Sequence, residues 1–183
     1  MRSALFALIC VLSLVTFDSR CPAAQTKAVS GRAVGEMTPS FPVLAVTGPH
    51  KGKSICYVCE YKDAPTIFAF FRQTGDGMGG VVKKLNELAH QNDKIRVVAI
   101  VIEGPDSQPE LERFAQENSI TIPLTVFRKG KDDVAMKLYK LNANMDNTIL
   151  VSVKRKVAAN LVNVKAENFT MLTNTITKVL DKK

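Results

Sequence analysis

Two largely apolar runs, with a helical repeat between them, constrain the fold of this chain most strongly. The first run follows Pro65, reads Thr-Ile-Phe-Ala-Phe-Phe and ends at Phe71, and the second covers residues 95–102, where Arg96 is the one charged residue. Runs of this length without polar alternation are typical of strands that are buried on both faces. Between them, residues 81–91 place apolar side chains at the spacing of one helix face. The pattern predicts a strand–helix–strand unit with two parallel strands.

Further elements are expected on both sides of this unit. Short strands are predicted at 41–46 and 54–61, a helix at 109–118, an extended segment at 120–127, a short helix at 133–141, a hairpin of strands 148–153 and 157–162, and a closing helix at 167–180. In the helix at 133–141 we expect Val134, Leu138 and Leu141 to face inward. The order predicts an α/β domain with a mixed central sheet, helices on both faces and an N-terminal β extension.

Composition excludes a disordered chain, because 46% of the 183 residues are hydrophobic and 23% are charged. The net charge of +8 suits anionic partners. However, the basic clusters at 128–131 and 154–156 are not interleaved with aromatic residues, so we expect no nucleic-acid binding. The second cluster is interpreted as the solvated tip of the hairpin.

The first residues have the pattern of a secretory signal. Met1-Arg2-Ser3 is positively charged, residues 4–17 are apolar, and small residues follow at Ala23 and Ala24. We predict a signal peptide at 1–24, a linker at 25–40 and one domain at 41–183, exported to the periplasm or the extracellular space. No later apolar run approaches membrane length, so no stable membrane span is expected after the signal is removed.

Four stretches of the chain form an ordered set of motifs: Val-Gly-Glu-Met-Thr-Pro-Ser-Phe at 34–41, Tyr-Lys-Asp-Ala-Pro at 61–65, the segment 114–124 from Phe-Ala-Gln-Glu to Ile-Pro-Leu, and the hairpin at 148–157. Taken in this order, they resemble the thioredoxin-like superfamily in its redoxin or peroxiredoxin form, the alkyl hydroperoxide reductase/thiol-specific antioxidant type. Together they cover most of residues 34–180. The resemblance implies a thioredoxin-like three-layer sandwich.

The chain departs from that family at the positions of the family's active site. Peroxiredoxins follow the first core strand with Thr-x-x-Cys, whose thiolate attacks peroxide. Here Thr74 is present, but Gly77 stands in the place of the cysteine. Met145-Asp146-Asn147 also replaces the arginine or proline expected before the hairpin. Without a thiolate nucleophile at this helix start, we do not expect a conventional peroxidase.

Once the signal peptide is removed, Cys56 and Cys59 are the cysteines that remain. Their spacing is that of a redox pair, but Tyr57 and Val58 between them favour extended backbone. On a straight strand their Cα atoms would lie roughly 10 Å apart, whereas a disulfide requires less than about 7 Å. A disulfide would therefore have to pull Tyr57 and Val58 into a tight, strained turn. A structural staple, a redox-active dithiol and metal ligation remain as alternatives.

The residues near the cysteine pair do not complete the ligand set of a zinc or haem site. Zinc normally takes four ligands, His50 is the only histidine near the pair, and Glu60 stands where covalent haem attachment needs a histidine. Residues 75–80, Gly-Asp-Gly-Met-Gly-Gly, formally match a dinucleotide-binding turn, with Glu103 after the next strand. We interpret them instead as a flexible loop, and we expect neither a cofactor nor a metal.

The leading hypothesis is an exported redoxin-type protein that acts as a thiol–disulfide oxidoreductase through the relocated pair Cys56 and Cys59. Its partner would be a protein dithiol or disulfide. The alternative is a non-enzymatic binding or structural domain with a degenerate active site and a structural cysteine pair. The sequence predicts neither the substrate nor the oligomeric state.

Overall fold

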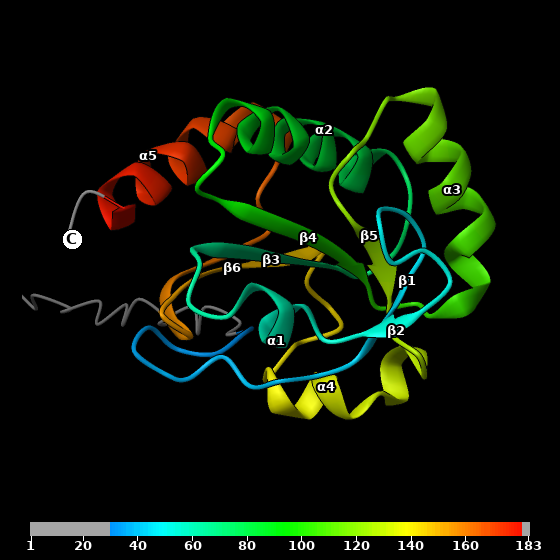
Figure 1. Cartoon of the computed structure of the whole chain (residues 1–183), viewed down its shortest axis with the longest axis horizontal. Coiled ribbons are helices and arrows are strands. Elements are labelled where there is room, and N and C mark those ends of the chain that lie inside the picture. The colour runs from blue at the N-terminus through cyan, green and yellow to red at the C-terminus, as the bar shows by residue number, and fades with distance from the viewer. Residues whose placement is uncertain (1–29, 181–183) are drawn as a thin grey trace, which may run out of the picture.

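A seven-stranded sheet runs through the centre of the molecule in the order β2-β1-β5-β4-β3-β6-β7 (Figure 1). The computed structural model describes residues 30–180, so the predicted signal peptide lies outside the described residues. The strands are β1 (Val43–Ala45), β2 (Ser54–Ile55), β3 (Thr66–Phe71), β4 (Arg96–Val101), β5 (Leu124–Val126), β6 (Asn147–Val153) and β7 (Lys156–Val162). The α-helices are α1 (Tyr57–Tyr61), α2 (Asp76–Gln91), α3 (Gln108–Glu117), α4 (Val134–Leu138) and α5 (Phe169–Leu180). Short 3-10 turns are η1 (Pro105–Ser107), η2 (Gly130–Asp132) and η3 (Ala166–Asn168).

Strand β3 lies in the interior of the sheet, between β4 and β6, and all six of its residues are buried. It pairs in parallel with β4 and antiparallel with β6, so that Ala69 lies opposite Ala99 on one side and Ile149 on the other. A strand covered on both faces needs apolar residues at every position, which explains the uninterrupted run. The predicted strand–helix–strand unit is confirmed.

Helices cover both faces of this sheet and give three layers (Figure 1). On one face, Val81 and Leu85 of α2 and Leu172 of α5 share a buried cluster with β3 and β4. On the other face, Tyr57 and Val58 of α1 lie in a second cluster with Phe70 and with residues of α4. The β1–β2 hairpin pairs antiparallel with the edge of β5, and it is the predicted N-terminal extension.

Residues 30–40 are hydrogen-bonded to strands β6 and β7 of the domain. The Ser30 and Thr148 hydroxyl groups lie 2.6 Å apart, and the Thr38 and Ser152 hydroxyl groups lie 2.8 Å apart. Ser30 and Thr38 are both buried. The described part of the segment expected to be a linker therefore packs against the hairpin.

The expectation of a flexible loop at residues 75–80 is wrong. Gly75 is the N-cap of α2, and the helix begins at Asp76, so Gly77, Gly79 and Gly80 are helical. A Cβ atom at Gly79 would meet the Phe114 ring at 3.1 Å, and one at Gly80 would meet Ala166 at the same distance. These glycines allow α2 to approach its neighbours closely, so they have a packing role in a helix.

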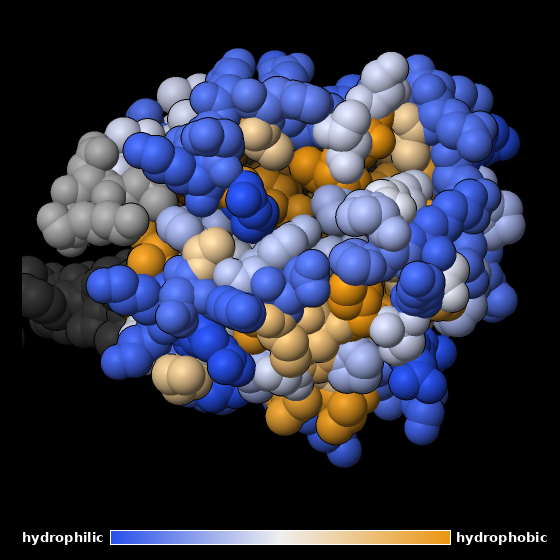
Figure 2. Space-filling view, in the orientation of Figure 1, coloured by the Kyte–Doolittle hydropathy of each residue, from blue (hydrophilic) through white to orange (hydrophobic). Residues whose placement is uncertain are grey.

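The predicted inward face of α4 is also wrong at two positions. Val134 and Leu138 are 59% and 36% exposed, whereas Ala135 and Tyr139 are fully buried. Asp133 caps the helix by accepting a hydrogen bond from the Ala135 amide, and the helix turns Ala135 and Tyr139 into the second buried cluster. Figure 2 shows the resulting apolar surface at the lower edge of the molecule, over α4. Within residues 30–180, no helix has the length and apolar character needed to cross a membrane.

Candidate functional site

Helix α1 brings the two predicted site cysteines together. Cys56 is its N-cap, with extended backbone, and Cys59 is in its first turn. Their Cα atoms are 5.3 Å apart, and the two sulfur atoms form a disulfide. The expectation of extended backbone at Tyr57 and Val58 is therefore wrong, because residues three apart become neighbours on a helical turn. No strained turn is needed to close the pair.

Burial of the residues between the cysteines explains the local helix. Tyr57 and Val58 are 2% and 3% exposed, and both pack against the sheet with Phe70. On a short strand these two side chains would point to opposite faces, whereas one helical turn buries both. Tertiary packing thus overrides their β propensity.

The two sulfur-bearing residues differ in exposure. Cys59 is exposed to solvent, whereas Cys56 is half-buried and packs against the cluster beneath α1. Burial also affects the neighbouring phenols: it raises the pKa of Tyr61 to about 12, and it raises the pKa of Tyr57 further. The environment beneath the disulfide is therefore apolar, and its outer side is open to solvent.

Two polar residues that are distant in sequence lie beside Cys59. Ser40 Oγ is 3.4 Å from Cys59 Sγ, and Arg155 Nη2 donates a hydrogen bond of 3.1 Å to the same hydroxyl oxygen. The sequence alone predicts Ser40 in the linker and Arg155 at a solvated hairpin tip. Separations of 19 and 115 residues leave no local pattern that could have identified these contacts.

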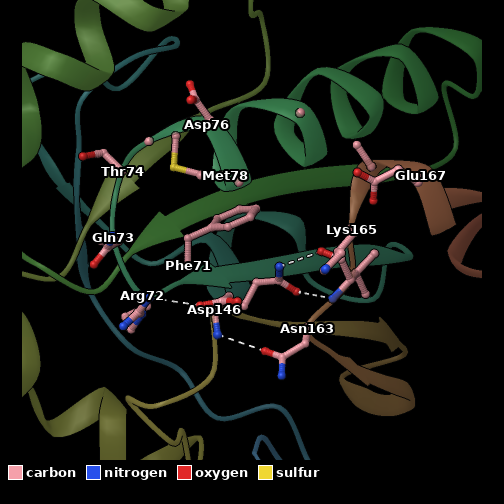
Figure 3. A pocket seen from close by; sticks show the side chains of 16 residues that line it. Phe71, Arg72, Gln73, Thr74, Asp76, Met78, Asp146, Asn163, Lys165 and Glu167 are labelled. Carbon is pink, nitrogen blue, oxygen red and sulfur yellow. Dashed lines mark hydrogen bonds and ion pairs between the residues drawn. The ribbon is translucent and has the colours of Figure 1, made fainter.

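A second candidate location is the pocket at the carboxyl end of β3, which has a volume of about 460 Å³ (Figure 3). Gly77 lies in the first turn of α2 on its wall, at the position where the resemblance would place a peroxidase cysteine. Within residues 30–180 the cysteines are Cys56 and Cys59, which precede β3 and lie on the opposite face of the sheet from α2. The pocket therefore contains no thiol.

Polar side chains line the mouth of this pocket. Arg72 Nη2 forms an ion pair with Asp146 Oδ1 at 3.0 Å, and the Asp146 amide donates to Asn163 (Figure 3). The Thr74 hydroxyl donates to Glu110 at 2.6 Å, so it is already engaged within the protein. Among the described residues no peptide bond is cis, including those before β6 where the family would place its proline. The mouth of the pocket is polar, and its lining has no group for thiol chemistry.

Among residues 30–180, no group of three or more His, Cys, Asp and Glu side chains is placed to hold a metal ion. His50 Nε2 lies 3.6 Å from Glu60 Oε1, and its ring packs edge-on to Tyr57. The residues described around Cys56 and Cys59 therefore include no set of metal ligands.

Comparison with known proteins bears on the fold. No protein-family model matches the sequence, and no curated protein matches it. Among solved structures, peroxidoxin BcpB from Mycobacterium tuberculosis superposes with a TM-score of 0.63 at 17% identity, covering 82% of this chain and 97% of that one. A PrxQ mutant from Xylella fastidiosa gives 0.62 at 13% identity, covering 84% and 99%. A thiol-disulfide oxidoreductase from Bacteroides fragilis gives 0.57 at 13% identity, covering 76% and 98%.

This chain has a thioredoxin-like fold. Three superpositions that cover nearly the whole of each partner decide it, and they confirm both the predicted resemblance and the predicted three-layer sandwich. The thioredoxin-like domain carries a Cys-x-x-Cys disulfide on α1, ahead of β3. The chemical roles of Cys56 and Cys59 stay a prediction.

Proposed function

We propose that this thioredoxin-like protein exchanges disulfides with protein partners through Cys56 and Cys59. The observation that carries the proposal is the partly exposed disulfide at the start of α1, on a domain whose pocket beyond β3 contains no thiol. In the exchange, two electrons pass from a partner dithiol to the Cys56–Cys59 disulfide, or in reverse from the reduced pair to a partner disulfide.

Accessibility supports a redox role over a structural staple. Thiol–disulfide exchange requires the attacking sulfur to approach along the disulfide, which the exposed side of Cys59 permits. A buried pair would favour the alternative, a binding or structural domain. The solved structure from Bacteroides fragilis is described as a thiol-disulfide oxidoreductase, which agrees with this class of reaction.

The chain's first residues add a proposal about location. With the predicted signal peptide at 1–24, we infer that the domain is exported to the periplasm or the extracellular space. Disulfides persist in these compartments. The proteins found there therefore include disulfide-bonded partners for exchange. A dedicated partner dithiol would keep the pair reduced if the protein acts as a reductant.

The test is catalysis of exchange with a protein disulfide. The reduced protein is added to insulin with a dithiol present, and the rate of insulin reduction is compared with that of free cysteine at the same thiol concentration. We expect the wild type and the control variant Ser54→Ala to exceed free cysteine, and the double variant Cys56→Ser/Cys59→Ser to lose the excess. Equal rates for the wild type and the double variant would favour the non-enzymatic alternative.

A further inference from the structure

We propose that Cys59 is the sulfur that bonds to the partner, that Cys56 is the leaving and resolving thiol, and that Ser40 and Arg155 are positioning residues for Cys59. This assignment rests on the proposed function, and it adds which end of the pair reacts and which residues direct it. Four observations of the described residues carry it.

Exposure gives the direction of attack. Cys59 is exposed, whereas Cys56 is half-buried against the cluster that contains Tyr57 and Val58. The attacking, attacked and leaving sulfur atoms lie nearly in line during exchange, so the attacked sulfur must have an open side. A partner thiolate that approaches from solvent therefore meets Cys59, and Cys56 lies on the protein side as the leaving group.

The Ser40 hydroxyl prepares Cys59 to carry negative charge. Its oxygen lies 3.4 Å from Cys59 Sγ and accepts a hydrogen bond of 3.1 Å from Arg155 Nη2. Because the guanidinium occupies a lone pair of the oxygen, the hydroxyl proton is left free to point toward the sulfur. A hydrogen bond to a charged group is worth roughly twice a neutral one, so this contact favours the thiolate over the thiol.

Arg155 is held where its charge reaches this hydroxyl. It occupies the β6–β7 turn with a φ of 59°, and its carbonyl accepts a hydrogen bond of 2.8 Å from the Thr38 amide. Within residues 30–180, no carboxylate forms an ion pair with Arg155, and its Nε is buried without a partner. The nearest acidic neighbour of Cys59 in sequence, Glu60, is directed to His50 at 3.6 Å. The positive charge of Arg155 is therefore available to Ser40 and Cys59.

Cys56 has a contact suited to a leaving thiolate. The backbone amide of Cys59 donates a hydrogen bond of 3.2 Å to Cys56 Sγ. When the bond between the two sulfurs breaks, the negative charge that appears on Cys56 already has this donor. The same contact holds Cys56 within reach of Cys59 for the reverse step.

The steps balance as follows for reduction of a partner disulfide. The Cys59 thiolate attacks one partner sulfur, the partner S–S bond breaks, and the second partner sulfur leaves as a thiolate that takes a proton from water. Cys56, once deprotonated, then attacks Cys59, re-forming the Cys56–Cys59 bond and releasing the first partner sulfur. Two electrons have passed to the partner, and oxidation of a partner dithiol is the same sequence in reverse.

The test measures which thiol reacts first. The single variants Cys56→Ser and Cys59→Ser each leave one thiol, and each is mixed at pH 7 with the aromatic disulfide 5,5′-dithiobis(2-nitrobenzoate). We expect the thiol of Cys59 to react about tenfold faster than that of Cys56, the size of one charge-assisted hydrogen bond plus greater access.

The positioning role is tested in the Cys56→Ser background. We expect Ser40→Ala and Arg155→Asn each to slow the reaction of Cys59 by about fivefold to tenfold, and Ser40→Thr and Arg155→Lys to restore most of the rate. Lys154→Asn is the matched control for Arg155→Asn, because it removes one charge from a neighbouring exposed turn residue that also has a positive φ, 50°. Ser54→Ala is the control for Ser40→Ala, and near-ultraviolet dichroism verifies that every variant is folded.

The assignment is overturned if Cys56 reacts faster than Cys59, or if Ser40→Ala and Arg155→Asn behave like their controls. Failure of the proposed function has a different signature. In that case the wild type does not accelerate insulin reduction, even though Cys59 reacts faster than Cys56 and depends on Ser40 and Arg155.

Discussion

Opening the disulfide should weaken the domain without unfolding it. The bond closes a loop of four residues, from Cys56 to Cys59. For so short a loop, the chain-entropy relation gives about 2 kcal/mol of stabilisation at 25 °C. A domain of this size is stable by about 5–15 kcal/mol, so most of that stability should remain after reduction.

Packing beneath α1 supports the same expectation. Tyr57 and Val58 stay buried against Phe70 whether or not the sulfurs are joined. Full burial of one such side chain contributes about 1.5–3 kcal/mol, so the two side chains together contribute more than the bond. Helix α1 is therefore attached to the sheet mainly by its apolar residues.

The assay follows free thiols and near-ultraviolet dichroism together during titration with a dithiol. We expect thiols to appear while the tertiary signal persists, and the free energy of urea unfolding to fall by about 2 kcal/mol. The double variant Cys56→Ala/Cys59→Ala should unfold at the same urea concentration as the reduced protein. If thiols appear only as the tertiary signal collapses, the pair is a structural staple and the reasoning is refuted.

Three further predictions concern the tyrosines, peroxide and export. Burial raises the pKa values of Tyr57, Tyr61 and Tyr139, so the folded protein should show little phenolate absorbance at pH 10 and much more after unfolding in urea. The folded state favours the neutral phenols, so their contribution to stability is present below about pH 10, the ordinary tyrosine pKa, and is lost as the pH rises toward 12. Alkaline unfolding followed by dichroism tests whether stability falls over this range. With Gly77 in the nucleophile position, the protein should reduce peroxide no faster than free thiols. Faster reduction that is abolished by Cys56→Ser would contradict this and show that the relocated pair has peroxidase activity. N-terminal sequencing of protein recovered from its host should begin after residue 24 or within a few residues of it, whereas a membrane-bound protein that begins at Met1 would contradict export.

The sequence predicted the sheet well where burial is two-sided. Thr66–Phe71 is a strand over the whole of its predicted length, because an uninterrupted apolar run has few other solutions in a layered domain. The hairpin and the closing helix were also found, each within one or two residues of the structure. These elements carry their patterns locally, in the spacing of their own side chains.

The errors lie where long-range packing decides the local backbone. Helix α1 is five residues long, too short to show a period, and its Tyr57 and Val58 favour a strand when considered alone. The start of α2 was missed because glycine is a poor helix former, and only the proximity of Phe114 and Ala166 shows why glycine is needed there. The contacts of Ser40 and Arg155 with Cys59 exist only in the folded chain, for the same reason.

The reduction potential of the Cys56–Cys59 pair in the folded protein tests the central claim most directly. It is measured by equilibrating the protein in buffers of defined glutathione or dithiol ratio and counting alkylated thiols by mass. A redox-active pair should have a midpoint between about −180 and −270 mV, the range spanned by disulfide isomerase and thioredoxin. A midpoint below about −300 mV, typical of structural disulfides in secreted proteins, would contradict the proposed function.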